Sequence, residues 1–154
     1  MDDIPAVRLF VTDALELDGY TVFGTGDPHE ALQWARARRE PIHLLVTDVA
    51  MPRMSGPNLA KQLRALHSEA KVLFMSGSTV QELQDYGIAS GAPHLVKPFS
   101  VDDLRRKVRA ALALLQSERA HVDGTVGRDR ASFQAEDAIW NSCFTPDAFS
   151  KGDW

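Results

Sequence analysis

Three short apolar runs, each followed by a polar residue, constrain the fold of this chain more than any other feature. The runs cover residues 42–47, 72–75 and 93–96, and Asp48, Ser76 and Lys97 follow them. Nearly continuous apolar runs of this length are typical of strands buried on both faces of a parallel sheet. Helical patterns lie between the runs, so the sequence predicts an α/β fold with helices on both faces of the sheet.

Apolar residues recur at helical spacing in the segments between the runs. The predicted helices cover residues 5–18, 28–39, 59–66, 80–88 and 101–115. Asp3 and Pro5 suit the start of the first helix, and Gly19 suits its end. Asp27 suits the start of the second helix, and a capping box of Ser100 and Asp103 should begin the last one. Residues 20–23 are aromatic and β-branched, which predicts a further strand.

The composition excludes several classes of protein. The chain has 154 residues, 44% of them hydrophobic and 25% charged, which is ordinary for a globular domain. Its apolar runs are shorter than the roughly 18 residues of a membrane helix, so no membrane is expected. A sequence pI of about 5.7 argues against nucleic-acid binding. The single cysteine, Cys143, fits a reducing compartment, and we expect a cytoplasmic protein.

The polar ends of the runs suggest chemistry. Ligands of such sheets bind beyond the carboxyl ends of the strands, where Asp48, Ser76 and Lys97 should meet. Asp2 and Asp3 precede the first helix, and if that helix starts at the same edge they add two carboxylates. Clustered carboxylates need a cation, and magnesium suits such hard oxygen ligands. A carboxylate can accept a phosphoryl group, while magnesium and a lysine neutralise the charge of that group.

These residues, in this order, resemble the receiver domain of bacterial two-component response regulators. The resemblance covers residues 1–116 and rests on the Asp2-Asp3 pair, LLVTD ending at Asp48, MPRMSG at 51–56, FMSGS at 74–78 and KPF at 97–99. It implies a flavodoxin-like, doubly wound parallel sheet of strand order 2-1-3-4-5. Residues 117–154 would form a polar tail that is disordered or has one short helix.

The resemblance also implies a role for each site residue. Asp48 would be the phosphoacceptor, Ser76 the hydroxyl switch residue and Lys97 the lysine that contacts the phosphate. Asp2, Asp3, Asp48 and the backbone carbonyl of Ala50 would hold Mg²⁺. The Lys97-Pro98 peptide bond would be cis.

The implied activity is signalling rather than conventional catalysis. A histidine kinase or a histidine phosphotransfer protein would donate the phosphoryl group, and magnesium-dependent self-phosphorylation and dephosphorylation would be the only reactions. A downstream protein or a second copy of the chain would read the switched surface.

Two departures from the family pattern stand out. The switch position, usually aromatic, is His94 in this chain. The family also has a buried strand before its acid pair, whereas here only Met1 precedes Asp2. We expect that the chain is a fragment or that its start is misassigned. The alternative is that another segment or another chain fills the gap.

Two other functions remain open at this point. A sheet without its first strand could fail to hold magnesium, and the chain would then be a phosphorylation-independent interaction module, a pseudo-receiver. An aspartyl-nucleophile enzyme such as a dehalogenase-like phosphatase needs a second acid two residues after the nucleophile. That position is Ala50, which counts against it.

Overall fold

The sheet at the centre of the molecule is parallel and has three strands in the described part of the chain. A computed structural model describes residues 1–77, 80–89 and 91–122, with the backbone alone for 80–82 and 114–122. The strands are β1 (Leu44–Asp48), β2 (Lys71–Ser76) and β3 (His94–Val96), in the order β1-β2-β3. Thr47 pairs with Phe74, and Phe74 pairs with His94. Each predicted apolar run therefore contributes one strand, and the α/β prediction is confirmed.

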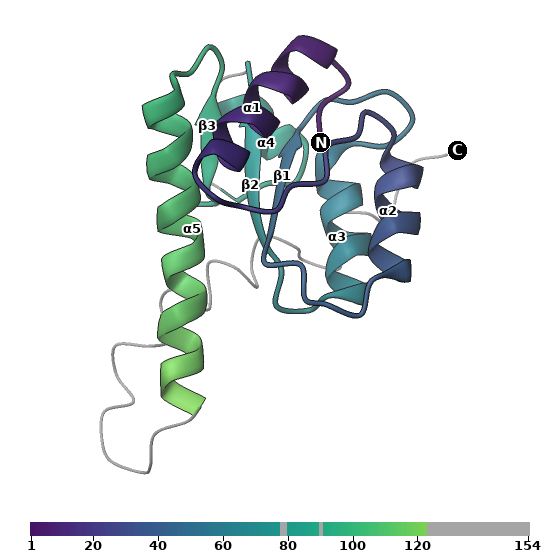
Figure 1. The fold of residues 1–154 in the computed structure, drawn as a ribbon. Coiled ribbons are helices and arrows are strands. Elements are labelled where there is room, and N and C mark those ends of the chain that lie inside the picture. Colours follow the sequence, from purple (N-terminus) through teal and green to yellow (C-terminus); the bar gives the residue numbers. More distant parts are fainter. Residues whose placement is uncertain (78–79, 90, 123–154) are drawn as a thin grey trace.

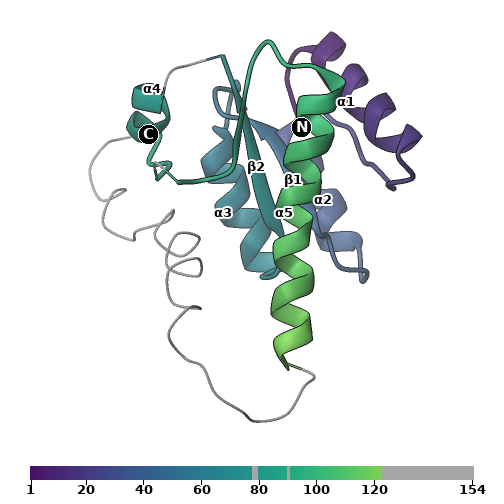
Figure 2. The same cartoon turned by 90° about the vertical axis from the view of Figure 1, so that its left-hand side faces the viewer.

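Helices cover both faces of this sheet (Figures 1 and 2). They are α1 (Pro5–Leu17), α2 (Pro28–Ala37), α3 (Gly56–Leu66), α4 (Val80–Asp85) and α5 (Val101–Val122). Residues of α1 and α5 pack with Leu73 and Met75 of β2, whereas residues of α2, α3 and α4 pack with Val72 and Phe74. Successive side chains of β2 thus enter opposite cores, which explains why every residue of this strand is buried.

The helix ends follow the local sequence in most places. Asp27 accepts a hydrogen bond from the His29 N–H at the start of α2, as predicted. Gly19 has φ +87°, a left-handed conformation that stops the chain after α1 at little steric cost. The predicted Asp3 cap is wrong, because the residue flanking α1 is Ile4 and no side chain caps this helix. Pro5 still occupies its first position.

The strand predicted at residues 20–23 does not form. This segment belongs to no ladder, and β1 is an edge strand on the side that faces it. A strand needs a neighbour for its backbone hydrogen bonds. The segment lies across a cavity from β1, so its β-forming residues have no partner within reach.

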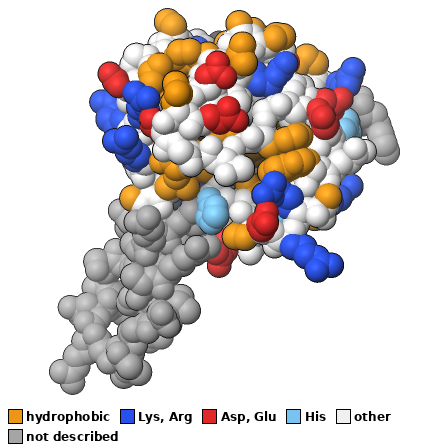
Figure 3. All heavy atoms as spheres, viewed as in Figure 1, with side chains coloured by type: hydrophobic (Ala, Val, Ile, Leu, Met, Phe, Trp, Pro, Cys, Tyr) orange, Lys and Arg blue, Asp and Glu red, His pale blue; other side chains and the backbone are white. Residues whose placement is uncertain are grey.

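The surface of α1 carries apolar side chains that the core does not cover. Ile4, Leu9, Phe10 and Leu17 are exposed, and Figure 3 shows hydrophobic side chains gathered at the upper end of the face where α1 lies. The helix therefore buries a single stripe that includes Val11 and Leu15.

The last helix is longer than predicted. α5 continues to Val122, beyond the boundary expected after residue 116, and the predicted tail from residue 123 onward lies outside the described residues. Within the described ranges, no helix combines the length and apolarity needed to cross a membrane.

Candidate functional site

Three charged residues from distant parts of the chain meet at the carboxyl edge of the sheet. The Lys97 Nζ lies 2.5 Å from Asp48 Oδ1 and 2.7 Å from Asp2 Oδ2. Asp48 is the last residue of β1, and Lys97 directly follows β3. Parallel strands present their carboxyl ends on one side, which is why these residues converge. At the edge predicted from the sequence, Asp48 and Lys97 are thus in direct contact, and Asp2 joins them.

The position of Asp48 is fixed by the loop that follows it. Its Oδ2 accepts a hydrogen bond of 3.0 Å from the Ala50 N–H, and its side chain is largely buried. Gly56 returns the loop to the strand end, where its N–H donates to the Val49 carbonyl. A Cβ at Gly56 would lie 2.1 Å from the Asp48 carbonyl oxygen. Only glycine allows this close approach of the two backbones.

Asp2 is fully buried although it is the second residue of the chain. Its Oδ1 accepts a hydrogen bond of 2.9 Å from the Ile4 N–H, while its Oδ2 contacts Lys97. Arg8 donates from Nη1 to the Asp2 backbone carbonyl over 2.7 Å. These contacts hold the Asp2 carboxylate beside the Lys97 ammonium.

The role of Arg8 was missed by the sequence analysis, although a signal existed. Arg8 shares the helical stripe of Val11 and Leu15, at spacings of three and four residues. A cation on the apolar stripe of a helix points toward the core and therefore needs an internal partner. Here that partner is the Asp2 carbonyl.

The pKa values of Asp48 and Lys97 are both raised, for different reasons. Burial raises the pKa of Asp48, and the hydrogen bond from Lys97 opposes this shift without cancelling it. Burial alone would lower the pKa of Lys97, but hydrogen bonds to Asp2 and Asp48 outweigh it and raise the value. Lys97 is therefore held as an ammonium. Taken alone, the triad pairs one ammonium with two carboxylates, and its formal net negative charge favours an additional cation.

The other predicted residues lie around this triad in different ways. Ser76 ends β2, is buried, and accepts the Lys97 N–H with its backbone carbonyl. His94 begins β3 and donates from Nδ1 to the Ala92 carbonyl over 3.1 Å. The Lys97-Pro98 peptide bond is cis, as the resemblance implied. Asp3 is exposed and is not drawn into the triad.

The donor set at this edge fits a hard divalent cation in part. Asp2 and Asp48 already direct one oxygen each at a single cationic group, the Lys97 ammonium. Carboxylates and a backbone carbonyl, which Ala50 can supply, are ligands that magnesium prefers. Among residues 1–77, 80–89 and 91–122, however, no three acidic, histidine or cysteine side chains gather into a ready metal cluster.

Comparison with known sequences identifies related proteins. The family described as response regulator receiver domain matches residues 1–109. The response regulator receiver protein CpdR of Brucella abortus is 33% identical over 112 residues, which cover 72% of this chain and 92% of CpdR. The sensor kinase CckA of the same organism is 33% identical over 113 residues. The chain spans only 12% of CckA and 47% of the probable transcriptional regulator TcrX of Mycobacterium tuberculosis.

Solved structures share the fold. The chemotaxis protein CheY4 of Vibrio cholerae is 32% identical and superposes with a TM-score of 0.63, over 72% of this chain and 93% of CheY4. A response regulator of Burkholderia pseudomallei, solved with a phosphorylated aspartic acid and a calcium ion, is 25% identical with a TM-score of 0.60. That match covers 82% of this chain and 74% of the other.

Proposed function

Because this chain belongs to the family of response regulator receiver domains, we propose that Asp48 accepts a phosphoryl group in a two-component phosphorelay. The observation that carries this proposal is the pair of contacts from the Lys97 ammonium to Asp48 and Asp2. A buried carboxylate beside a fixed ammonium can bind and neutralise a transferred phosphoryl group. The phosphorylated aspartic acid in the Burkholderia pseudomallei structure supports the same chemistry for a related fold.

The transfer itself needs little covalent chemistry from the protein. An oxygen of the Asp48 carboxylate forms the new bond to phosphorus, while the bond from phosphorus to the donor's imidazole nitrogen breaks. The imidazole leaves with the bonding electron pair and takes a proton from solvent. Lys97 already contacts Asp48 Oδ1, so its charge lies where the new negative charge develops. Water later cleaves the acyl phosphate and regenerates the carboxylate.

Magnesium is the cofactor that this site would use. Asp2, Asp48 and the Ala50 carbonyl would hold the ion, with Asp3 as an additional carboxylate from the adjacent position. When bound, magnesium supplies positive charge to the phosphoryl oxygens. Asp2 supports this role because it is buried and its oxygens are held by Ile4 and Lys97.

Phosphorylation would then act as a switch. A phosphoryl group at Asp48 adds charge and acceptor oxygens close to the end of β2, where Ser76 is buried. We expect the Ser76 hydroxyl to move toward these oxygens and the surface around His94 to change with it. His94 lies in the strand next to that of Ser76, which makes it the position that transmits the change.

The partners follow from the same chemistry. The donor would be a histidine kinase or a histidine phosphotransfer protein, as the similarity to part of the sensor kinase CckA suggests. A downstream protein or a second copy of this chain would recognise the switched surface. We propose no conventional enzymatic activity, no nucleic-acid or membrane partner and a cytoplasmic location.

A second function, the phosphorylation-independent interaction module, is favoured by two observations. Asp3 is exposed, and the described residues contain no ready cluster of three metal-binding side chains. If Lys97 alone balances Asp2 and Asp48, the site could be permanently closed to magnesium. Such a module would bind its partner without any response to a phosphodonor.

Phosphorylation can be tested directly on the purified chain. We expect a small-molecule phosphodonor with magnesium to add one phosphoryl group by intact mass, and Asp48→Asn to abolish the gain. Asp13→Asn removes an exposed acid of α1 outside the site and should leave the gain unchanged. Equal labelling of the wild type and Asp48→Asn would refute Asp48 as the acceptor. No labelling of the wild type at any magnesium concentration would refute the proposal and favour the interaction module.

A further inference from the structure

Three hydrogen bonds close a ring at the start of α1. Asp2 Oδ1 accepts from the Ile4 N–H over 2.9 Å, and the Ile4 carbonyl accepts from the Arg8 N–H over 3.1 Å. Arg8 Nη1 then donates to the Asp2 carbonyl over 2.7 Å. The residue that flanks the helix, Ile4, provides no side-chain cap. The ring therefore fixes where Asp2 lies relative to the first turn of α1.

The Arg8 contact acts on the Asp2 carboxylate through the backbone. Asp2 is fully buried, so its carbonyl depends on partners inside the protein. Loss of the charge-assisted hydrogen bond from Arg8 would favour a backbone position in which this carbonyl reaches water. The carboxylate belongs to the same residue and would move with it, away from Lys97.

The guanidinium of Arg8 occupies space that Gly26 leaves open. A Cβ at Gly26 would lie 2.6 Å from Arg8 Nη1 and 3.3 Å from its Cζ. Nη1 is the atom that donates to the Asp2 carbonyl, so a side chain at this position would displace the donor itself. Gly26 is not among the residues with positive φ. The close approach of Arg8, rather than the backbone conformation, is therefore what requires glycine here.

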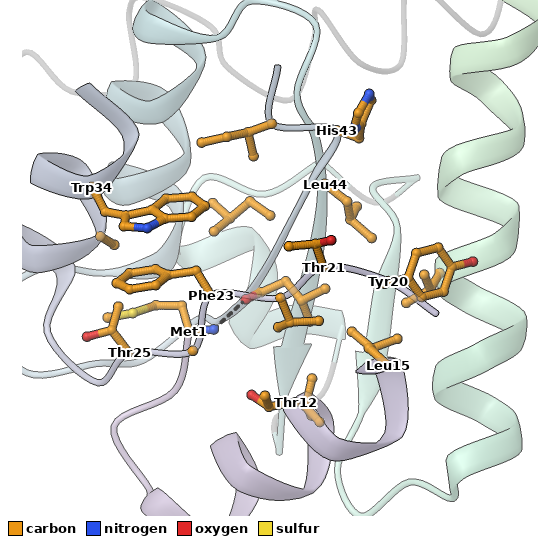
Figure 4. Close-up of a pocket in the computed structure, with 18 of the residues that line it drawn as sticks. Met1, Thr12, Leu15, Tyr20, Thr21, Phe23, Thr25, Trp34, His43 and Leu44 are labelled. Atoms are coloured by element: carbon orange, nitrogen blue, oxygen red, sulfur yellow. Dashed lines mark hydrogen bonds between the residues drawn. The ribbon is translucent and has the colours of Figure 1, made fainter. Parts of the chain in front are cut away.

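The loop of residues 24–27 lies beside α1 and reaches a second part of the site. Thr12 of α1 and Thr25 of the loop line the same cavity (Figure 4). Asp27 accepts a hydrogen bond of 3.0 Å from Arg53, which belongs to the segment between β1 and α3. The loop that contacts the Arg8 guanidinium is thus also joined to the segment that follows the carboxyl end of β1.

Charge and position predict opposite effects of Arg8 on a bound cation. The guanidinium has the same sign of charge as a metal ion, so by Coulomb's law alone it would weaken the site. It contacts the carbonyl of Asp2, however, while the carboxylate oxygens receive the Ile4 N–H and the Lys97 ammonium. Arg8 therefore fixes the position of this carboxylate without taking up either of its oxygens.

We propose that Arg8, held in the space beside Gly26, is a positioning residue that keeps the Asp2 carboxylate in place for a divalent cation. The inference rests on the proposed function, because it takes Asp2 as a ligand of magnesium. Its consequence is that Arg8 strengthens cation binding in spite of its own charge. Residues that orient a metal ligand in this way typically change metal affinity by about 10- to 100-fold.

Four variants of the full chain separate position from charge. Arg8→Met removes the guanidinium and keeps an unbranched side chain. Gly26→Ala keeps the charge of Arg8 but displaces Nη1. Gly24→Ala is the matched control in the same loop, because its Cβ would lie 2.7 Å from Thr12 Oγ1 but at an ordinary 3.7 Å from Arg8 Cγ. The fourth variant combines Arg8→Met with Gly26→Ala.

Two measurements are made on each protein. The rise of Tm across a magnesium titration gives the dissociation constant, and Tm without magnesium gives the stability separately. Hydrogen exchange of the Ile4 amide reports whether Asp2 Oδ1 still accepts its bond. A residue with a purely structural role would lower the Tm without magnesium and leave the dissociation constant unchanged.

We expect Arg8→Met and Gly26→Ala each to raise the magnesium dissociation constant by about tenfold or more. Both should also speed exchange of the Ile4 amide, while Gly24→Ala changes neither quantity. In the double variant, Gly26→Ala should add no further loss, because the donor that it displaces is already gone.

Tighter magnesium binding in Arg8→Met would show that charge outweighs position and would overturn the proposal. An unchanged dissociation constant or unchanged Ile4 exchange in Gly26→Ala would overturn it as well. A wild type whose Tm does not respond to magnesium would overturn the proposed cation site and this inference with it. A wild type that responds, with variants that respond equally, would overturn the role of Arg8 alone.

Discussion

At the scale of single residues, the site is governed by one ammonium that two carboxylates share. Lys97 holds Asp2 and Asp48 together, and Asp2 in turn is held by the Ile4 N–H and by Arg8 at its carbonyl. Burial raises the pKa of Asp48 in spite of the contact with Lys97, so the ionised carboxylate costs stability in the folded protein. A group kept charged at a cost to stability is typical of residues retained for chemistry.

Replacing Asp48 by asparagine should therefore increase the free energy of unfolding at neutral pH in the absence of magnesium. A raised pKa in the folded protein means that the ionised carboxylate is less favourable there than in the unfolded chain. Below the unfolded value of about 4 the acid is protonated in both states, and the difference vanishes. The gain should appear as pH rises from about 4 through the folded pKa and stay constant above it.

Urea unfolding of the wild type and Asp48→Asn at several pH values measures this gain. Asp13→Asn, an exposed acid outside the site, should show no comparable change. A difference between wild type and Asp48→Asn that is the same at pH 3 and pH 7 would contradict the assignment to ionisation.

At the scale of elements, α5 presents the clearest agreement between local sequence and structure. The Ser100 Oγ accepts the Asp103 N–H over 3.1 Å, and Asp103 Oδ2 accepts the Ser100 hydroxyl over 2.7 Å. This reciprocal cap begins the helix three residues after Lys97, and Leu104 and Val108 then anchor it to β2 and β3. The cap therefore helps to hold the loop that carries the lysine.

Removal of this cap should destabilise the domain moderately. Ser100→Ala deletes the acceptor for the Asp103 N–H, and the loss of such a cap costs about 1 kcal/mol of unfolding free energy. Ser100→Thr keeps a hydroxyl in the same place and should recover most of the loss. Chemical denaturation of the three proteins measures both effects. A threonine variant as unstable as the alanine variant would show that the hydroxyl is not what matters.

At the scale of the whole molecule, the site joins residues that lie far apart in the described chain. Asp2 and Lys97 are 95 residues apart, yet they share a contact of 2.7 Å because α1 and β3 deliver them to one edge. Anything that binds this edge is therefore linked to global folding. A ligand with affinity for the folded state alone raises the apparent stability of the entire domain.

Magnesium should show this linkage. At ten times its dissociation constant a single bound ion adds about 1.4 kcal/mol to the unfolding free energy. Asp2→Asn should abolish the increase, since it removes a buried carboxylate of the site, and Ser100→Ala should keep it at a lower baseline stability. Tm measured across a magnesium titration gives the result. An increase that survives in Asp2→Asn would locate the ion elsewhere.

The sequence by itself determined the features that depend on neighbours along the chain. These are local patterns: the helical spacing of apolar residues, the caps at Asp27 and Ser100, and the apolar runs before Asp48 and Ser76. In each place the structure has the predicted cap, helix or strand. The order of the motifs also identified the edge at which Asp48 and Lys97 meet.

Only the tertiary structure decided the features that depend on a distant partner. Residues 20–23 favour a strand but form none, because strand pairing needs a neighbour that local sequence cannot supply. The position of α1 likewise decides that Asp2 is buried and that Asp3 is exposed. It also decides that Arg8 donates to the Asp2 carbonyl. Backbone hydrogen bonds within a helix join residues four apart in the sequence, whereas those of a strand need a second segment that can be distant in the sequence.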